Sequence, residues 1–400
     1  MEFDMVDNAA LGTVIKVVGV GGAGGNAVQH MINKGMAGVE FIAANTDAQA
    51  LSASSAHNII QIGESGLGAG MRPEVGRQLA EQSRMRIEDA LRGAHMVFIA
   101  AGMGGGTGTG AAPIVAEVAK NLGALTVAVV SKPFSYEGQK CMDVAENGLE
   151  ELSKHVDSLI VILNEKLEEI YEDDSMLEWM KYADDVLNNA VAGIAEIINV
   201  PGHINVDFND VKTIMSEQGK AMMGTATASG VDRARIAAEQ AVASPLLDGI
   251  DLSGARGVLV NVTASRGLKG KEIKEVMAAV RAFAAPDAAI AQGIAYDDAM
   301  GDELRVTVVA TGLGRNKASI SLVQPQQVLR TGTYGAPMMS GTPGVTGGVT
   351  IGSAGGAGGA DGMKQPAVWR REQASEQVRA MQNNGVETYD IPAFLRKQAD

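Results

Sequence analysis

The sequence is poor in cysteine, in aromatic residues and in positive charge. It has one cysteine in 400 residues, and aromatic residues make up 4%. A single cysteine excludes an internal disulfide framework and a Cys-based zinc site, and it fits a reducing cytoplasm. Lys plus Arg number 33 against 47 Asp plus Glu, which gives a net charge of −14. Nucleic acids and anionic membranes repel such a chain, so we expect no nucleic-acid partner.

Long apolar runs are also missing. No stretch reaches about 18 apolar residues, so we expect no direct membrane insertion. Residues 1–11 are acidic and lack the basic-then-apolar pattern of a signal peptide, which predicts a cytoplasmic protein. Hydrophobic residues nevertheless make up 46% and charged residues 20%, so the chain buries real cores and is neither wholly disordered nor fibrous. At roughly 150 residues per domain, its length predicts two or three domains.

Glycine is abundant, with 50 residues that fall into two groups. The first group forms short clusters between apolar runs, at Gly19–Gly25, Gly63–Gly70 and Gly102–Gly110. The second group fills Gly332–Gly362 together with Ser, Thr, Ala and Pro, without helical or strand periodicity. Such a tract is typical of a flexible linker. We therefore expect a folded part from about residue 12 to residue 323, and a short apolar patch at Tyr389–Lys397 after the linker.

Strands and helices are predicted to alternate in the first half. Apolar, β-branched runs predict strands at residues 13–20, 39–44, 96–101, 125–130 and 158–163. Amphipathic segments predict helices at residues 26–34, 73–92 and 111–122. Continuous apolar strands between such helices indicate an α/β fold, with a parallel sheet covered on both faces.

A long helix is predicted at residues 176–199, ending before Pro201-Gly202. Beyond it the pattern changes to helices at residues 206–216, 232–243 and 269–283. These mix with strands at residues 257–263, 288–296 and 304–310. The sequence therefore predicts a smaller α+β domain joined to the first through the long helix.

Two of the glycine clusters follow predicted strands and open predicted helices. Glycine lets the backbone approach a phosphate, and a helix N-terminus offers free N–H groups. The first cluster contains G-x-G-x-x-G with Asp47 downstream, so a dinucleotide site and a ligand-free tight turn both stay open. The second, Gly102–Gly110, adds two hydroxyls, which suits a run of several phosphates. Because G-x-x-x-x-G-K-[ST] is absent, backbone amides and a metal would neutralise most of the phosphate charge.

The heptapeptide Gly104–Gly110 resembles the tubulin signature loop. Four further segments strengthen the likeness, and together they make the chain similar to the FtsZ family, the bacterial tubulin-like cell-division GTPases. These segments are Gly21–Ala27, Asn45–Ala48, Lys132–Phe134 and Asn205–Asp210.

The resemblance implies a division of the chain and an activity. The parts are a GTP-binding domain at 12–175, a central helix at 176–200, an α+β domain with the synergy loop at 201–323, a flexible, disordered linker at 324–386 and an interaction peptide at 387–400. It further implies assembly-dependent hydrolysis of GTP to GDP, with Mg²⁺ bound through the nucleotide and no direct protein ligand. Subunits would stack head to tail into filaments of the cytokinetic ring at mid-cell.

The resemblance also implies the nucleotide site. Asn26 and Asp184 match positions near the guanine and Glu137 one near the ribose, while Asp47 and Gly70 lie in loops near the γ-phosphate and Mg²⁺. Cys141 departs from the pattern, because the family shows an arginine there, and this predicts weaker nucleotide binding. The full set of implied GTP-binding positions is Gly21, Gly22, Ala23, Gly24, Gly25, Asn26, Asp47, Gly70, Gly104, Gly105, Gly106, Thr107, Gly108, Thr109, Gly110, Pro133, Glu137, Cys141 and Asp184.

Asp207 and Asp210, with Asn205, are the implied catalytic residues. Two carboxylates three residues apart at the start of a helix share one face. Within one subunit they would repel the triphosphate, whereas from the adjacent subunit they can orient a water or a hydrated cation. The alternative is that Asp207 or Asn205 only caps the helix, and Asp207 can fill both roles.

The C-terminal patch resembles the family's peptide for membrane-tethering division proteins. The implied contact residues are Asp390, Ile391, Pro392, Phe394 and Leu395, of which the apolar ones can form one face. A disordered tail with accidental hydrophobic residues is the alternative.

Two other functions stay open for the whole chain. The first is an NAD-dependent oxidoreductase, although a dinucleotide site has no use for the second Gly-Thr loop. The second is a nucleotide-binding scaffold that assembles without hydrolysis. The pair Asp207 and Asp210 counts against the scaffold, and Cys141 mildly favours it.

Overall fold

A computed structural model describes residues 12–199, 206–217, 220–244, 255–285 and 287–313. Several predictions fall outside these residues, namely Asn205, the linker at 324–386 and the interaction peptide at 387–400 with Asp390, Ile391, Pro392, Phe394 and Leu395. Within the described residues, none of the helices combines the length and the apolar character needed to cross a membrane.

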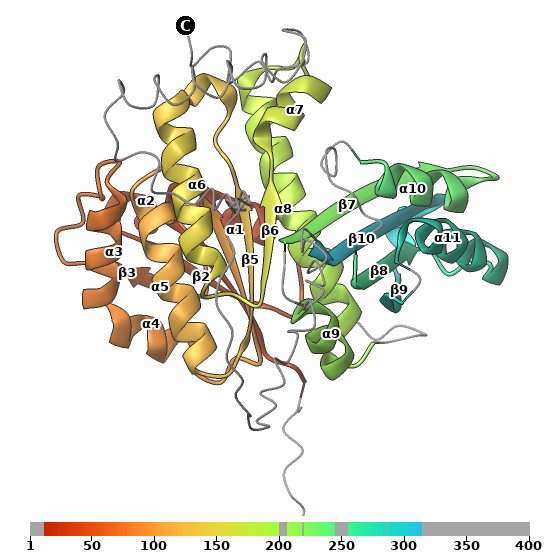
Figure 1. Cartoon of the computed structure of the whole chain (residues 1–400), viewed down its shortest axis with the longest axis horizontal. Coiled ribbons are helices and arrows are strands. Elements are labelled where there is room, and N and C mark those ends of the chain that lie inside the picture. The colour runs from red at the N-terminus through yellow and green to blue at the C-terminus, as the bar shows by residue number, and fades with distance from the viewer. Residues whose placement is uncertain (1–11, 200–205, 218–219, 245–254, 286, 314–400) are drawn as a thin grey trace, which may run out of the picture. The chain divides into compact units, whose positions relative to one another are not determined.

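Six parallel strands form the first part of the sheet (Figure 1). Their spatial order is β3 (Asn58–Gln61), β2 (Glu40–Asn45), β1 (Ile15–Val20), β4 (Met96–Gly102), β5 (Leu125–Ser131) and β6 (Ser158–Ile162). Val17 of β1 pairs with Phe41 on one side and with Phe98 on the other. From β1 the chain builds outward to β2 and β3, and then returns to the other side of β1 with β4. Ligands of open α/β sheets bind at such a reversal, beyond the carboxyl ends of the strands.

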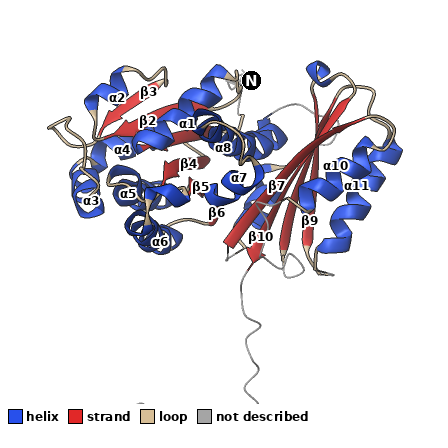
Figure 2. Ribbon diagram, turned by 90° about the horizontal axis from the view of Figure 1, so that it is seen from above, coloured by secondary structure: helices blue, strands red, loops and turns tan. Residues whose placement is uncertain are grey.

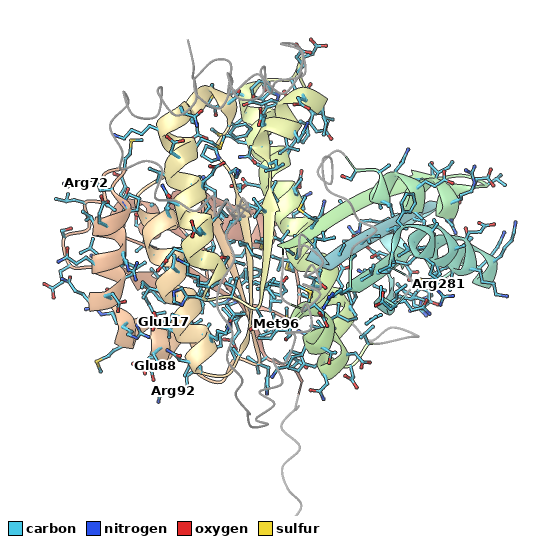
Figure 3. All side chains as sticks on the ribbon, in the orientation of Figure 1. Arg72, Glu88, Arg92, Met96, Glu117 and Arg281 are labelled. Carbon is cyan, nitrogen blue, oxygen red and sulfur yellow. The ribbon has the colours of Figure 1, made fainter. Side chains whose placement is uncertain are left out.

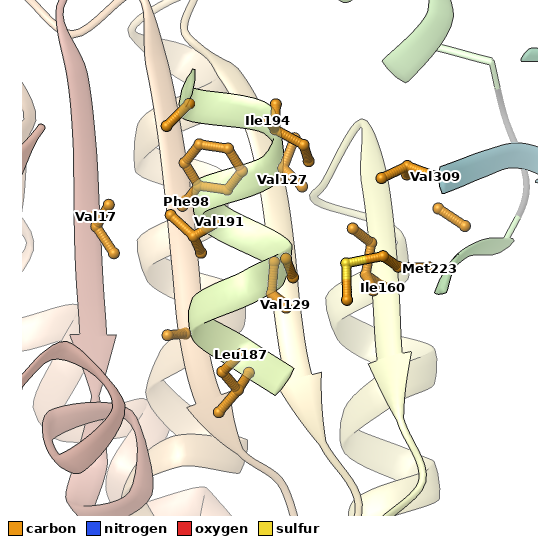
Figure 4. Close-up of a cluster of buried hydrophobic side chains, with 14 of the residues drawn as sticks. Val17, Phe98, Val127, Val129, Ile160, Leu187, Val191, Ile194, Met223 and Val309 are labelled. Carbon is orange, nitrogen blue, oxygen red and sulfur yellow. The ribbon is translucent and has the colours of Figure 1, made fainter. Parts of the chain in front are cut away.

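Helices cover both faces of these strands (Figure 2). On one face, α1 (Gly21–Asn33) and α8 (Met176–Asn199) pack on Phe98, Val127 and Val129, as Figure 4 shows for Leu187, Val191 and Ile194 of α8. The other face is covered by α3 (Pro73–Gln82), α4 (Arg84–Leu91), α5 (Thr107–Asn121) and α6 (Gln139–Ser153). Two short helices, α2 (Ala48–Ser52) and α7 (Asn164–Ile170), complete this part. The strands are apolar throughout because both of their faces are buried.

The helix α8 runs from the first part of the fold to the second. Its 24 residues correspond to roughly 36 Å at 1.5 Å per residue. Near its end, Gly193 packs so closely on Thr307 that a Cβ at this glycine would lie 2.8 Å from the threonine methyl group. The bounds of α8 confirm the helix predicted at 176–199.

The second part carries four further strands in the order β7 (Lys220–Ser229), β10 (Glu303–Leu313), β8 (Gly257–Ala264) and β9 (Ala289–Tyr296). The strand β10 runs antiparallel to both β7 and β8, whereas β8 and β9 are parallel. Among the residues that the structure describes, two pairs join β6 to β7, Leu159 with Lys220 and Ile160 with Ala221. One face is covered by α10 (Arg233–Val242) and α11 (Gly270–Phe283), and α9 (Phe208–Met215) precedes β7. This confirms the predicted fold class, a parallel-sheet domain joined by a central helix to a smaller α+β domain.

Three helix predictions need correction. The helix predicted at residues 73–92 is two helices, because the buried Ser83 interrupts it and its hydroxyl accepts a hydrogen bond from Gly63 N at 2.9 Å. The helices predicted to start at Asn26 and Ala111 begin earlier, at Gly21 and Thr107. The first glycine-rich segment therefore forms the first turn of α1. The second is divided between a short loop at residues 103–106 and the first turn of α5.

Candidate functional site

A cavity of about 660 Å³ opens beyond the carboxyl ends of β1, β4 and β5. It lies where the order of the strands reverses, and it is lined by backbone-rich glycine segments at one end and by larger side chains at the other. The lining residues are Gly22, Ala23, Asn26, Gly70, Met71, Gly102, Met103, Gly105, Gly106, Thr107, Gly108, Ser131, Lys132, Pro133, Phe134, Tyr136, Glu137, Asn164, Met176, Met180, Ala183, Asp184 and Leu187.

Two helices begin at the glycine-rich end without a capping side chain. The N-cap of α1 is Val20 and that of α5 is Gly106, so neither helix has a side chain that accepts its first N–H groups. These N–H groups and the positive ends of both helix dipoles form a site for anions. The two turns also touch, since a Cβ on Gly21 would lie 2.9 Å from Gly108 N. Glycine is needed at position 21 for this approach and for its φ of +75°.

Few charged side chains line the cavity. Lys132 is the one cation among the lining residues that the structure describes, and its Nζ lies 3.2 Å from the carboxylate of Glu146. Within the described residues, no group of three or more His, Cys, Asp or Glu side chains could hold a metal ion. The lining residues fit an Mg²⁺ ion that is held by phosphate oxygens and water better than one that is held by several protein ligands. An anion here would be neutralised mainly by backbone N–H groups and by such an ion.

The other end of the cavity presents polar groups beside aromatic rings and methionines. Tyr136 stacks on Phe134 at 5.4 Å between ring centroids. The Oδ1 of the buried Asn164 has no hydrogen-bond partner among the described residues. Burial raises the pKa of Asp184 to about 6, and the nearby Asp185 adds to the rise while His30 opposes it. A pocket with a flat apolar wall and a carboxylate beside it can bind a planar heterocycle that offers two N–H donors.

Eleven of the predicted GTP-binding positions line this cavity, and the other eight do not. Asp47 caps α2, where its Oδ1 accepts from Gln49 N at 2.8 Å. Thr109 is buried, and its hydroxyl accepts from Gly104 N at 2.9 Å. Gly110 packs on the backbone of Pro73. Gly21, Gly24, Gly25, Gly104 and Cys141 likewise lie outside the lining.

Some lining residues were not predicted, chiefly at the aromatic end. Asn164 directly follows β6, so its place at the carboxyl edge of the sheet was the available signal. Met180, in the first half of α8, also lines the cavity. The further lining residues outside the list of predicted GTP-binding positions are Met71, Gly102, Met103, Ser131, Lys132, Phe134, Tyr136, Met176, Ala183 and Leu187, of which Gly102 and Met103 belong to the predicted phosphate segment Gly102–Gly110.

Asp207 and Asp210 lie at the opposite edge of the sheet from the cavity. Asp207 is the N-cap of α9, with its Oδ1 accepting from Asp210 N at 2.8 Å. The next residue, Phe208, packs edge-on against His95, which directly precedes β4. Figure 3 labels Met96, the first residue of β4, and Arg72, which follows the cavity-lining Met71. The two labelled residues lie toward opposite edges of the sheet. Seven residues of β4 at about 3.3 Å each separate the two edges by roughly 20 Å, so these carboxylates cannot reach the cavity of their own chain.

Models of two protein families match the chain. Residues 14–172 match the GTPase domain of the Tubulin/FtsZ family, and residues 219–314 match the C-terminal domain of the FtsZ family. The chain is 49% identical to the cell division protein FtsZ of Pseudomonas aeruginosa over 405 residues, with 100% of both chains covered. The chain belongs to the FtsZ family. It is also 58% identical to FtsZ of Buchnera aphidicola subsp. Schizaphis graminum over 310 residues, which cover 76% of this chain and 81% of the relative.

Solved structures support the FtsZ fold. The FtsZ dimer from M. jannaschii matches with a TM-score of 0.72 and 44% identity, over 76% of this chain and 88% of that one. CetZ2 from Haloferax volcanii, at 21% identity and a TM-score of 0.63, supports the fold alone. Membership of the FtsZ family makes the first part a GTPase domain and the chain a cell-division protein. It also decides against the NAD-dependent oxidoreductase, which strand order alone does not exclude.

Cys141 gives a first prediction for this FtsZ family member. It lies in the first turn of α6, and a Cβ on Gly104 would lie 3.1 Å from its carbonyl oxygen. An arginine here would add a cation beside a cavity with only one. We expect Cys141→Arg to bind GDP about tenfold more tightly, within the 1–3 kcal/mol of a buried charged contact. Equilibrium titration measures this; Asn147→Arg, the same charge farther along α6, is the control, and equal dissociation constants for wild type and Cys141→Arg would contradict the prediction.

Proposed function

We propose that the chain binds GTP with Mg²⁺ in the described cavity and hydrolyses it when a second copy stacks on it head to tail. The resulting filaments would form the cytokinetic ring at mid-cell, in the cytoplasm. One observation carries the proposal: the anion-binding cavity and the carboxylates of α9 lie at opposite edges of one sheet. FtsZ proteins form homopolymers, and the M. jannaschii relative was solved as a dimer.

The glycine-rich end is proposed to hold the phosphates. The uncapped first turns of α1 and α5 supply N–H donors at Gly22, Ala23, Gly106, Thr107 and Gly108. The buried residues around them, Gly21, Gly24, Gly104, Thr109 and Gly110, and the partly buried Gly25 are proposed to shape these turns. The γ-phosphate is proposed to lie near Asp47, Gly70 and Gly105. Mg²⁺ bound there would neutralise the charge that develops in the transition state without a rearrangement of the protein.

The other end is proposed to hold the nucleoside. The Asp184 carboxylate accepts from guanine N1–H and from the 2-amino group, a pair of donors that adenine lacks. Asn26 and Asn164 add polar contacts to the base, and Glu137 contacts the ribose. Pro133 and Phe134 form an apolar wall. The exposed carboxylate of Glu137 is held by Phe134 N, which donates to its Oε1 at 2.9 Å.

Hydrolysis is proposed to need the neighbouring subunit. Asp210, Asp207 and Asn205 of that subunit would face the γ-phosphate and accept a hydrogen bond from the attacking water, which aligns it for in-line displacement. Asp207 holds α9 through its cap, so its role combines structure and chemistry. Chemistry is thereby coupled to assembly, because the carboxylates of an isolated chain cannot reach its own cavity.

The ends of the chain complete the proposal. The proposed parts are the GTP-binding domain at 12–175, the central helix at 176–200, the α+β domain at 201–323, the linker at 324–386 and the interaction peptide at 387–400. The linker is proposed to be flexible, and a flexible tract of 60-odd residues would give the last part a reach on the order of 40–50 Å root mean square. Asp390, Ile391, Pro392, Phe394 and Leu395 are proposed to bind membrane-tethering division proteins.

Phosphate release from GTP and Mg²⁺ over a series of protein concentrations, with light scattering in parallel, tests the proposal. We expect activity per molecule to appear above a threshold concentration together with scattering, because each site needs two chains. Activity that does not change on dilution would contradict the shared site. Scattering that rises with GTP without phosphate release would favour the non-hydrolysing scaffold.

A further inference from the structure

Thr46 is a buried residue that the proposed GTPase mechanism does not use. It directly follows β2 and is 1% exposed. Its Oγ1 lies 2.6 Å from Oγ1 of Thr107, a distance typical of a strong hydroxyl–hydroxyl hydrogen bond. Thr107 is the first residue of α5 and lines the cavity. The contact joins segments 61 residues apart in the sequence, so no local turn explains it.

The backbone around Thr46 holds a second cavity segment. Its carbonyl oxygen accepts from Gly68 N at 3.2 Å, and Asp47 forms an isolated β-bridge with Leu67. Gly70 and Met71, a few residues on, line the cavity. Thr46 therefore sits between two segments that contact any ligand there, with its position fixed by the backbone of one and its hydroxyl directed at the other.

A hydroxyl has one hydrogen to donate and can accept two. If Thr107 donates to Thr46, its hydrogen is used and its oxygen lone pairs face the cavity, where they repel an anion. If Thr46 donates to Thr107, the Thr107 hydrogen is free to point at the anion. Hydrogen bonds to an ionised acceptor are roughly twice as strong as neutral ones, so an anion favours the second arrangement.

We propose that Thr46 is a positioning residue that donates to Thr107 and so fixes the Thr107 hydroxyl as a donor to a phosphate of the bound nucleotide. This deepens the proposed GTP site and rests on it. Thr46 does not touch the ligand. Before the ligand arrives, Thr46 excludes the orientation in which the lone pairs of the Thr107 hydroxyl would repel the phosphate. This lowers the cost of ordering the site.

Thr46→Val tests the hydroxyl, because valine keeps the branched shape and loses the donor. We expect its affinity for GDP to fall about fivefold, because Thr107 can still donate to the phosphate but its hydroxyl must then be ordered when the nucleotide binds. Thr46→Ser keeps the hydroxyl and should restore affinity to within about twofold of wild type. Guanosine lacks phosphate, so its dissociation constant, measured by competition with labelled GDP, should be the same for wild type and Thr46→Val.

Coupling to Thr107 separates orientation from a general structural role. In a Thr107→Val background, Thr46→Val should cause no further loss of GDP affinity, since no hydroxyl remains to be oriented. Thermal melting checks that each variant folds, and Thr46→Ala replaces Thr46→Val if the valine variant does not fold. Three outcomes would each overturn the inference. The first is wild-type affinity for GDP in both Thr46→Val and Thr46→Ala. The others are losses that add up in the double variant, and a loss of guanosine affinity as large as the loss of GDP affinity. Failure of the wild-type chain to bind GDP would instead overturn the proposed function.

Discussion

Replacing Asp210 by Asn is expected to reduce GTP turnover by about 100-fold and to leave the dissociation constant for GDP unchanged. The amide keeps the size of the side chain and α9 keeps its cap, because the cap is the side chain of Asp207. What is lost is the carboxylate that would orient water at the next subunit's γ-phosphate, and general-base groups contribute typically 10²–10⁴-fold. Steady-state phosphate release and GDP titration measure the two quantities. Asp232→Asn removes an exposed carboxylate elsewhere in the second part of the fold and should behave as wild type.

Mixing two proteins that each hydrolyse GTP poorly shows whether Asp210 acts on its own chain or on its neighbour. The first is Asp210→Asn, which keeps its nucleotide cavity. The second is Asp184→Asn, expected to bind XTP in place of GTP, which keeps Asp210. Given γ-labelled GTP and unlabelled XTP, the mixture should release labelled phosphate at a rate neither protein reaches alone. Co-assembly without labelled phosphate, or a wild-type rate from Asp210→Asn alone, would contradict the in-trans mechanism.

The sequence predicted the central strands well because burial on both faces leaves a simple pattern. The strands β1, β4 and β5 are almost unbroken apolar runs, and each was predicted to within two residues. In contrast β7, rich in Ala, Gly and Thr, carries no such pattern. It is a strand because it pairs with β10 along most of its length, and pairing between distant segments is invisible to a local pattern.

The two ends of the cavity differed in how well the sequence predicted them. The phosphate end consists of contiguous glycine segments at the starts of α1 and α5, so a motif could identify it. The nucleoside end is assembled from Phe134 after β5, Asn164 after β6 and Met180 within α8. These residues meet only because β5, β6 and α8 are neighbours. A charge argument assigned Asp207 and Asp210 to another subunit's site; their position roughly 20 Å from the cavity supports that hypothesis independently.

Replacing Asp184 by Asn is expected to exchange the preferred base. The carboxylate accepts two hydrogen bonds from guanine, whereas the amide presents one acceptor and one donor, and its donor faces the guanine 2-amino group. Affinity for GDP should fall on the order of 100-fold, because a site built to pair with a donor rejects a mismatched group strongly. Xanthine carries an oxygen in place of that amino group, so XDP should bind the variant better than GDP does. Competition titrations measure both; a variant that binds GDP as wild type does would remove Asp184 from the base site.

The same carboxylate should make nucleotide affinity depend on pH. Since burial raises the pKa of Asp184 to about 6, the accepting, ionised form predominates above that pH and is lost as the pH falls through it. At pH 5 about one molecule in ten would be ionised, so GDP should bind about tenfold more weakly than at pH 7.5. Other charged groups are close by: His30 and Lys34 pair with the adjacent Asp185 at 2.8 and 2.9 Å, and GDP carries its phosphates. Asp184→Asn keeps all of these groups, so the pH dependence of its GDP affinity is the baseline. Between pH 7.5 and pH 5, the wild type should lose more GDP affinity than this variant, and the difference reports the ionisation of Asp184.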